Sequence, residues 1–433
     1  MNTFKPLFFT NLLLALALAI ASASPVAAQE SAPAQQPEDP PLPQAQLTLD
    51  DLRTFTDVFN QARNNYVEEV DDKTLLDAAI RGMLLELDPH SSYLPAKKYE
   101  ELNDAAKGRY SGIGVDVQTR DGKIVVNAII NDSPADEAGL NPGDVITSIN
   151  GDEVRGRNLP DAMDEIGGDP DTDVVLTVQP EEGEAREVKI TRKYVRVPTM
   201  RYEQIGETYG YFKLSQFHRE TSAQLKQALD SIAAEGTELS VLVFDLRNNP
   251  GGVLQQAVGL ADGFLDEGVI VSTRGRNAKM QMEFTANPGQ WLPDTSVIIL
   301  VDRGTASASE VVSGAVQDHG RALVVGERTF GKGSVQSVLP LRNGAGIKLT
   351  TALYYTPSGR SIQAQGIEPD VAIEWETFSA EGDERIRESD LERHLGQKTG
   401  AGGARAEATV QTPEDYQLEA VLEALRNAGL ISG

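Results

Sequence analysis

The sequence predicts a multidomain α+β protein, in which a small helical region, a compact β-rich module and a larger α/β core follow one another. Three successive hydrophobic patterns predict this order. Apolar residues recur at helical spacing over 47–107, alternate in short runs over 108–192, and form longer runs between helical stretches over 193–375. With 433 residues, 40% of them hydrophobic, the chain is long enough for two or three domains.

The first 28 residues are typical of a cleaved secretory signal. Lys5 precedes an apolar run from Leu7 to Ile20, and small residues lead to Ala28, after which we expect cleavage. The alternative is a retained transmembrane anchor, but the run is shorter than the roughly 20 residues that span a bilayer. Without cysteine, neither a lipid anchor on that residue nor a disulfide can form. We therefore expect an exported protein of the periplasm or cell envelope.

The helical region is flanked by a linker, and two further segments follow the core. Residues 29–46 are rich in Pro, Gln and Ala and predict a disordered linker. Within 47–107, "DLRTFTDVFNQARNNYV" and "DKTLLDAAIRGMLLELD" each carry an apolar stripe and predict a helix. Residues 376–412 predict a flexible linker and 413–433 an amphipathic C-terminal helix. The net charge of −26 argues against nucleic acid and anionic membrane surfaces as partners.

Candidate chemistry begins in "SVIILVDRGTASASEVV", where a buried strand enters a short loop and a helix opens near Ser307. At a helix N-terminus, unpaired N–H groups and the helix dipole can stabilise a developing oxyanion, which favours a nucleophilic serine. A capping box of Ser307 and Glu310 would explain the same residues without catalysis. The stretch alone does not separate these interpretations, nor Ser307 from Ser309.

A lone lysine, Lys332, lies between two glycines in "RALVVGERTFGKGSVQSVLPL". Burial lowers a lysine pKa, and enzymes bring it from about 10.4 to roughly 7–8 so that the neutral amine can accept a serine proton. Gln336, four residues later, could hold the amine by hydrogen bonding. The alternatives are a solvated loop lysine and a phosphate-binding loop. Gly333 replaces the hydroxyl residue of that second motif, and a predicted strand follows where it requires a helix.

A third stretch, "VLVFDLRNNPGGVLQQAV", ends a buried strand with Asn249-Pro250-Gly251-Gly252 and enters a helix. Glycines allow a ligand to approach the backbone closely, although a plain turn would use the same residues. Together, the three loops offer a nucleophile, a base and oxyanion donors at the ends of three strands.

Seven stretches then resemble one family, the carboxyl-terminal processing peptidases, which are PDZ-containing serine proteases with a Ser-Lys pair. The matching stretches keep the family order and cover nearly everything from 50 to 372: "LDPHSSYL", "SGIGV", "SPADEAGLNPGDVITSING", "FDLRNNPGG", "TASASE", "GRALVVGERTFGKGSVQ" and "YYTPSGRSIQAQGIEPD". The resemblance implies a PDZ domain over 108–192 and a protease core over 193–375, built of β-α units of the crotonase- or Clp-like ββα type.

The resemblance also implies site roles. Ser307 is the nucleophile, Lys332 the general base and Gln336 the group that orients the lysine. The oxyanion donors are the N–H groups of the following residues: Ala308, Gly251 and Gly252, with Gly252 preferred. In the PDZ domain, "SGIGV" is the carboxylate-binding loop, and a peptide C-terminus is received by Gly112, Ile113, Gly114 and Val115 while the peptide adds as a strand.

The sequence thus predicts an exported serine endopeptidase that recognises protein C-terminal tails through its PDZ domain and cleaves them. The alternative is a non-catalytic PDZ scaffold that only binds peptides. No metal or organic cofactor is expected. Partners are expected among protein and peptide C-termini, with an envelope adaptor protein and further copies of the chain as candidates, and without nucleic acid.

Overall fold

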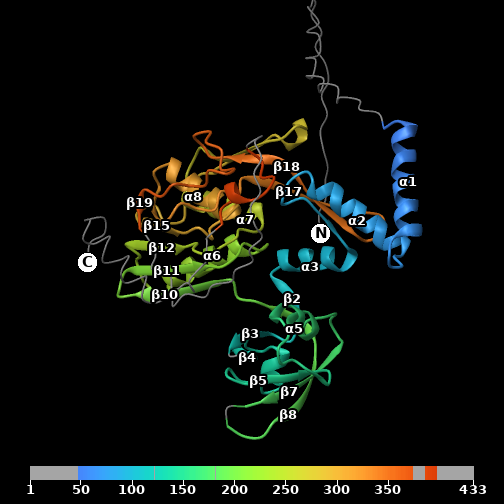
Figure 1. Ribbon diagram of the computed structural model, residues 1–433. Coiled ribbons are helices and arrows are strands. Elements are labelled where there is room, and N and C mark those ends of the chain that lie inside the picture. Colours follow the sequence, from blue (N-terminus) through green and yellow to red (C-terminus); the bar gives the residue numbers. More distant parts are fainter. Residues whose placement is uncertain (1–46, 121, 181, 374–385, 397–433) are drawn as a thin grey trace, which may run out of the picture. The chain divides into compact units, whose positions relative to one another are not determined.

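The computed structural model describes residues 47–120, 122–180, 182–373 and 386–396 (Figure 1). The predicted signal 1–28, the linker 29–46 and the C-terminal helix 413–433 lie outside these residues. The helical region contains α1, α2, β1 and α3, with these bounds: Leu49–Asn65, Asp72–Leu85, Ser92–Leu94 and Ala96–Ala106. Thr48 caps α1 and exchanges hydrogen bonds with Asp51, while Asp71 caps α2.

The apolar stripe of α1 is uncovered in the described part of the chain. No residue of α1 is buried, and Leu52, Phe55 and Val58 keep 49%, 52% and 64% of their surface exposed. The predicted helix therefore forms, but its apolar side does not enter the core of the described residues.

The β-rich module is a twisted antiparallel sheet in the strand order β3-β4-β5-β7-β8, with β6 paired to β5. Its side chains alternate between core and solvent, as the period-two sequence pattern predicts. Because β3 pairs only with β4, it is an edge strand. The elements of the module, with the separate pair β2 and β9, are β2 Arg109–Gly112, β3 Val115–Arg120, β4 Lys123–Ile129, α4 Pro134–Glu137, β5 Val145–Ile149, β6 Asp152–Glu153, α5 Leu159–Ile166, β7 Asp173–Gln179, β8 Arg186–Thr191 and β9 Lys193–Arg196.

The core of the larger domain is a sheet in the order β10-β11-β12-β15-β16-β19, parallel from β11 to β19. Its central strands are buried over nearly their whole length, which explains the continuous apolar runs in the sequence. The strands are β10 Met200–Ile205, β11 Tyr209–Leu214, β12 Val241–Asp245, β15 Ser296–Val301, β16 Ala322–Gly326 and β19 Val371–Ala372.

A second sheet, β1-β18-β13-β14 with β17 on β18, faces the same helices from the other side (Figure 1). Helices α7 and α8 pack against both sheets, so nine residues of α8 are buried, among them the polar Ser309, Glu310 and Ser313. The remaining elements are α6 Thr221–Ala234, α7 Leu254–Phe264, β13 Val269–Arg274, η1 Ala278–Met280, β14 Met282–Thr285, α8 Ala308–Asp318, β17 Ser334–Pro340, β18 Gly346–Tyr355 and η2 Glu388–Asp390.

Part of the stretch predicted as a flexible linker is ordered. Within 386–396, Glu388 opens the short helix η2 and is fully buried, because its carboxylate finds two partners, the partly buried His90 and the buried Gln363. That portion of the prediction for 376–412 is therefore wrong.

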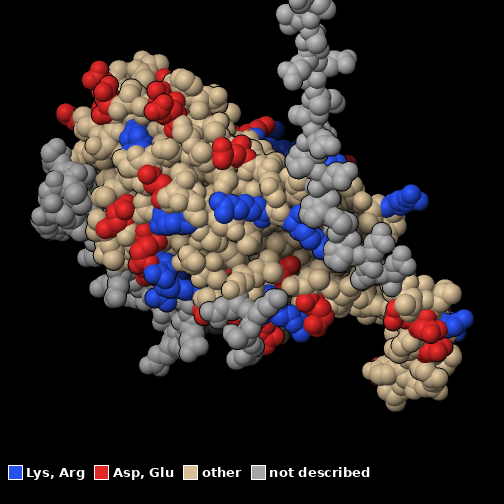
Figure 2. All heavy atoms as spheres, turned by 90° about the horizontal axis from the view of Figure 1, so that it is seen from above, with Lys and Arg blue, Asp and Glu red and all other residues tan. Residues whose placement is uncertain are grey.

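Charged side chains of both signs are interspersed on the face shown in Figure 2, without a continuous patch of one sign. None of the helices in the described ranges is long and apolar enough to cross a membrane.

Candidate active site

Three loops meet at one edge of the parallel sheet. Strands β12, β15 and β16 are neighbours and run in the same direction, so the loops after them leave the sheet at the same end. These loops are 246–253, 302–307 and 327–333, and they carry the predicted oxyanion glycines, nucleophile and base. The structure thus brings together the three stretches that the sequence analysis selected.

Ser307 occupies a strained turn between β15 and α8. Its φ of 56° and ψ of −114° lie where residues other than glycine are rarely found. Ser307 and Glu310 form the capping box that the sequence allows: the Ser307 N–H donates to Glu310 Oε2 over 2.7 Å, and the Ser307 side chain faces the Glu310 N–H, which donates to the Ser307 carbonyl over 2.9 Å. The capping arrangement is therefore present, and it leaves the hydroxyl without a full hydrogen bond.

Glu310 joins the nucleophile loop to the base loop. Its carboxylate is fully buried and accepts four hydrogen bonds, from the N–H of Ser307, Gly331 and Lys332 and from the hydroxyl of Thr329. Burial raises the pKa of Glu310 to about 7, against the lowering effect of these donors. Because Ser307 and Lys332 both donate to Oε2, their backbone nitrogens lie within reach of one oxygen atom.

Lys332 lies in the electrostatic setting expected of a lysine base. Burial lowers its pKa, and the positive charge of Lys348 lowers it further, while the carboxylates of Glu388 and Glu310 act in the opposite direction. A lowered pKa increases the fraction of neutral amine near neutral pH, which is the form that can accept a proton.

The base loop has no room for the alternative phosphate-binding geometry. A Cβ at Gly333 would lie 2.2 Å from the backbone nitrogen of Gln363, so the loop is packed against another segment. Strand β17 begins directly afterwards at Ser334, where the phosphate-binding motif requires a helix.

Gln336 lies on β17 opposite Thr350 of β18. Its Nε2 donates to Thr350 Oγ1 over 2.8 Å and to Ser334 Oγ over 3.2 Å, whereas its Oε1 is buried without a partner. Within the described residues, no hydrogen bond joins Ser307 Oγ, Lys332 Nζ or Gln336 Oε1 to one another. The structure therefore brings their segments together, but the three side-chain groups are not hydrogen-bonded to one another.

The predicted oxyanion donors differ in availability. The Gly251 N–H donates to Asn249 Oδ1 over 2.9 Å, and a Cβ on Gly251 would lie 2.9 Å from that of Ser307. The N–H groups of Gly252 and Ala308 have no acceptor among the described residues. Of the three predicted donors, only Gly252 and Ala308 therefore have N–H groups available to a ligand.

Asn249, which the sequence analysis left without a role, holds the glycine loop against the nucleophile loop. It is fully buried, and its Nδ2 donates to Leu214 O over 2.8 Å. Its carbonyl accepts the Ala306 N–H and the Ser309 hydroxyl, over 2.9 and 3.2 Å. Ser309 is thereby engaged, which favours Ser307 as the free hydroxyl. In the sequence, the only indication of this role was the polar stretch "RNN" directly after a predicted buried strand.

A buried ion pair supports the same loop from the end of β12. Arg247 binds Asp245 through Nε and Nη2, and the Tyr211 hydroxyl donates to Asp245 over 2.7 Å. Burial opposes the charged guanidinium, but the hydrogen bonds and charge of Asp245 outweigh it and raise the pKa of Arg247. The guanidinium therefore stays charged, and its hydrogen bonds to Asp245 fix the start of the loop.

The predicted carboxylate-binding loop lies between β2 and β3. Gly114 has a φ of 86°, and a Cβ there would lie 2.3 Å from that of Ser133, so only glycine fits. Ile113 is buried in the module, and the N–H groups of Ile113 and Gly114 have no acceptor among the described residues. Gly112 and Val115 instead lie in the flanking strands. The free donors therefore adjoin the edge strand β3.

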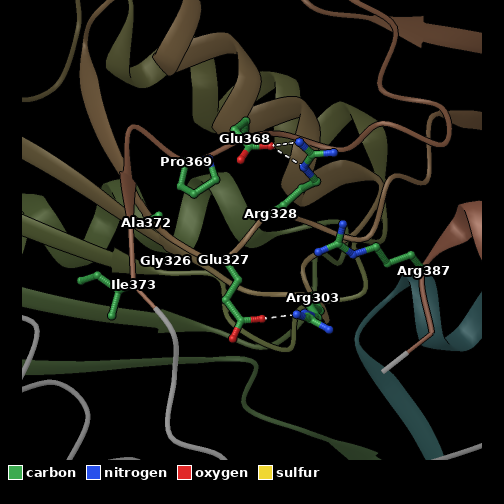
Figure 3. A pocket seen from close by; sticks show the side chains of 9 residues that line it. All are labelled: Arg303, Gly326, Glu327, Arg328, Glu368, Pro369, Ala372, Ile373 and Arg387. Carbon is green, nitrogen blue, oxygen red and sulfur yellow. Dashed lines mark hydrogen bonds and ion pairs between the residues drawn. The ribbon is translucent and has the colours of Figure 1, made fainter. Parts of the chain in front are cut away.

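A pocket of about 330 Å³ lies beside the base loop and contains none of the predicted site residues (Figure 3). Two ion pairs line it: Arg303 with Glu327, over 2.9 Å, and Arg328 with Glu368. They tie the loop after β15 and the segment before β19 to the loop that leads to Lys332.

The chain is 40% identical over 390 residues to a carboxy-terminal-processing protease of Bartonella bacilliformis, covering 88% of this chain and 89% of that protein. The chain belongs to the carboxy-terminal-processing protease family. Residues 208–373 match Peptidase family S41, 125–180 a PDZ domain and 15–98 the N-terminal domain of the activating protease CtpB. It is accordingly a serine-type peptidase with a PDZ domain.

Two further proteins are similar to the chain at lower identity. A probable CtpA-like serine protease of Staphylococcus aureus is 37% identical over 325 residues, covering 75% of this chain and 65% of that protein. Among solved structures, the photosystem II D1 C-terminal processing protease is 29% identical, with a TM-score of 0.46, and covers 76% of this chain and 94% of that one.

Proposed function

We propose that this peptidase is an exported serine endopeptidase that captures protein C-terminal tails with its PDZ domain and cleaves them with Ser307 and Lys332. The observation that carries the proposal is the Glu310 carboxylate, which accepts the N–H of both residues on one oxygen. Such a shared anchor holds a nucleophile and a base in a fixed relation. The sheet–helix–sheet core supports the crotonase- or Clp-like ββα description.

The reaction proceeds through an acyl-enzyme. Neutral Lys332 accepts the hydroxyl proton as Ser307 Oγ attacks the scissile carbonyl, and the N–H groups of Gly252 and Ala308 stabilise the oxyanion. The tetrahedral intermediate collapses, the C–N bond breaks, and the Lys332 ammonium gives its proton to the leaving amine. Lys332 then takes a proton from water, which attacks the ester carbonyl. As the ester C–O bond breaks, the Lys332 ammonium returns this proton to Ser307 Oγ, and the new carboxyl terminus is released with both residues restored.

Gln336 orients Lys332 in this scheme, and its unpartnered buried Oε1 is an acceptor for the lysine N–H groups. A buried acceptor without a partner is costly, so a donor is expected to approach it during the cycle.

Tail recognition uses the PDZ module. The free N–H groups of Ile113 and Gly114 receive the terminal carboxylate, while the peptide extends the sheet along the open edge of β3. Because hydrogen bonds to charged groups contribute about 1.5–3 kcal/mol, amidating the substrate C-terminus should raise KM by about tenfold or more.

Export and assembly complete the proposal. The apolar segment at 7–20 directs the chain to the periplasm or cell envelope. The uncovered stripe of α1, formed by Leu52, Phe55 and Val58, is a surface for a second copy of the chain or an envelope adaptor.

Ser307→Ala and Lys332→Ala, tested separately, should each abolish cleavage of a substrate with an exposed C-terminal tail while leaving the unfolding temperature close to that of the parent. Ser309→Ala is the matched control, since its hydroxyl is engaged by the Asn249 carbonyl. It should retain activity within about tenfold. Activity that survives in Ser307→Ala or Lys332→Ala, or a complete loss confined to Ser309→Ala, would contradict the assignment.

A further inference from the structure

The orientation of the Gln336 amide is determined by a residue far outside the protease core. An amide can face a neighbour with its oxygen or with its NH₂ group, and only the oxygen can accept from a lysine ammonium. In the structure, Nε2 faces Thr350 and Ser334, so the unpartnered Oε1 is the end left for Lys332. The residue that fixes the orientation of the Gln336 amide therefore affects Lys332.

Thr350 imposes the orientation through its single proton. Its hydroxyl lies 3.0 Å from Asp88 Oδ1 and 2.8 Å from Gln336 Nε2. A carboxylate oxygen only accepts, so the hydroxyl must donate its proton to Asp88. Thr350 Oγ1 is then available to Gln336 only as an acceptor, which requires the NH₂ group on that side.

Asp88 is itself held rigidly. Its side chain is 3% exposed, and it accepts the N–H groups of His90 and Ser91 and the Ser91 hydroxyl, over 2.8, 2.9 and 2.7 Å. The Thr350 N–H in turn donates to Ser91 Oγ over 3.1 Å. The turn that follows α2 is thus hydrogen-bonded to β18 at two points, and the acceptor cannot move away from Thr350.

We propose that Asp88 is a positioning residue for the catalytic lysine, acting through Thr350 and Gln336. The Asp88 relay, made of these three residues, keeps the amide oxygen turned toward Lys332 and its NH₂ group turned away. This inference rests on the proposed function, because it assigns a role within the same Ser307 and Lys332 site. It makes the N-terminal helical region part of the catalytic machinery.

Breaking the relay should change two properties of Lys332. If the amide can turn, its NH₂ group faces the lysine part of the time, which disfavours the ammonium and occupies the lone pair of the neutral amine. The pKa of Lys332 should therefore fall, and proton transfer from Ser307 should slow. The other charged groups that act on Lys332 are Lys348, Glu388 and Glu310. Thr350→Val leaves them unchanged, whereas Asp88→Asn also removes a charge that raises the pKa of Lys348.

The decisive variant is Thr350→Val, which has nearly the same shape and removes the hydroxyl without changing any charge. It should lower kcat by about tenfold, part of the 10²–10⁴-fold typical of a general base, with KM unchanged. Thr350→Ser keeps the hydroxyl and should restore kcat. Thr351→Val is the matched control, because it removes a similar hydrogen bond, to Ser337 over 2.7 Å, from the next residue of the same strand.

A second measurement does not depend on cleavage. NMR titration of labelled lysine side chains in Ser307→Ala protein, with the Lys332 signal assigned by Lys332→Met, gives its pKa directly. That pKa should be lower with Thr350→Val and with Asp88→Asn, and unchanged with Thr350→Ser and Thr351→Val. Thr350→Val separates the relay from the lost charge of Asp88→Asn.

The outcomes distinguish this inference from the proposed function. An unchanged Lys332 pKa in Thr350→Val, or an equal loss of kcat in Thr350→Ser and Thr350→Val, overturns the relay even if the parent protein cleaves. If the parent cleaves no substrate, the proposed function fails, and the NMR titration still decides whether the relay acts on Lys332. Unfolding temperatures close to that of the parent exclude misfolding as the cause.

Discussion

The nucleophile loop and the base loop share Glu310 but differ in their other supports. The nucleophile loop is also held from the neighbouring loop, where the Asn249 carbonyl accepts Ala306 N–H and the Ser309 hydroxyl. The base loop is also held from distant parts of the chain, since Gly333 donates to Gln363, which donates to Glu388. The serine is therefore fixed locally, whereas the lysine depends on both ends of the described chain.

The largest effect is expected at the shared anchor. Glu310→Gln places an NH₂ group against donors that now meet a carboxylate, so both loops lose their support. We expect kcat to fall by at least about 100-fold and the free energy of unfolding to fall by about 3 kcal/mol, as for other broken buried networks. Peptide kinetics and urea unfolding measure the two effects. Glu327→Gln, on the same loop but in a partly exposed ion pair, should change kcat by less than about tenfold.

The pH dependence of this stability difference has a definite sign. Folding raises the pKa of Glu310 from 4.5 to about 7, so its protonated form is favoured in the folded state. Stability from this group is present below pH 4.5 and is lost as the pH rises through about 7. Glu310→Gln cannot ionise, and the difference between the two proteins should therefore be smaller at pH 8 than at pH 5. A difference that grows with pH would contradict the raised pKa.

An intermediate effect is expected where only the base loop is supported. Glu388 is fully buried and binds His90 and Gln363, over 2.7 and 2.8 Å. Glu388→Gln can accept from one partner only, so we expect kcat to fall by about tenfold. Its pH–rate profile should also shift to lower pH, because a charge that raises the pKa of Lys332 is lost. A loss of kcat as large as that in Glu310→Gln would show that the nucleophile loop and the base loop do not differ in their supports.

The smallest effect is a change in the free energy of unfolding. Lys332→Met, which also abolishes activity, removes an ammonium whose burial is unfavourable. Between its lowered folded-state pKa and 10.5, stability of the parent rises with pH, because the unfolded state binds more protons. Lys332→Met should therefore be more stable at pH 7, by about 1 kcal/mol, and this gain should shrink toward pH 10.5. Lys97→Met, at an exposed position, should show no such gain. An equal gain in Lys97→Met would contradict the explanation that burial of the Lys332 ammonium is unfavourable.

The same contrast explains what the sequence could predict. The alternation of buried strands and helices, and the three loops after β12, β15 and β16, follow from local hydrophobic patterns. The choice of Ser307 over Ser309 needed the family resemblance, because a capping box and a nucleophile use the same letters. Glu310 was accordingly interpreted only as a possible cap residue, and its bonds to the base loop did not emerge from the sequence.

Contacts between distant segments were beyond local reasoning. Asp88 and Thr350 are 262 residues apart, and nothing in the periodicity around "LDPHSSYL" indicates where its carboxylate is directed. For the same reason, 386–396 was predicted as part of a linker, since one buried carboxylate in a polar stretch has no periodic signature. The uncovered stripe of α1 has the pattern of an ordinary core-facing helix.

The contact between His90 and Glu388 can form only late in the synthesis of the chain. Their positions are 298 residues apart, and Glu388 is among the last residues that the structure describes. A ribosome adds roughly 5–20 residues per second, so His90 waits for at least about 15 seconds before its partner exists. Until then the base loop lacks one of its supports. A chain whose synthesis stops before Glu388 would therefore be a poor protease. Full proteolytic activity would be reached only after this part of the chain has been made.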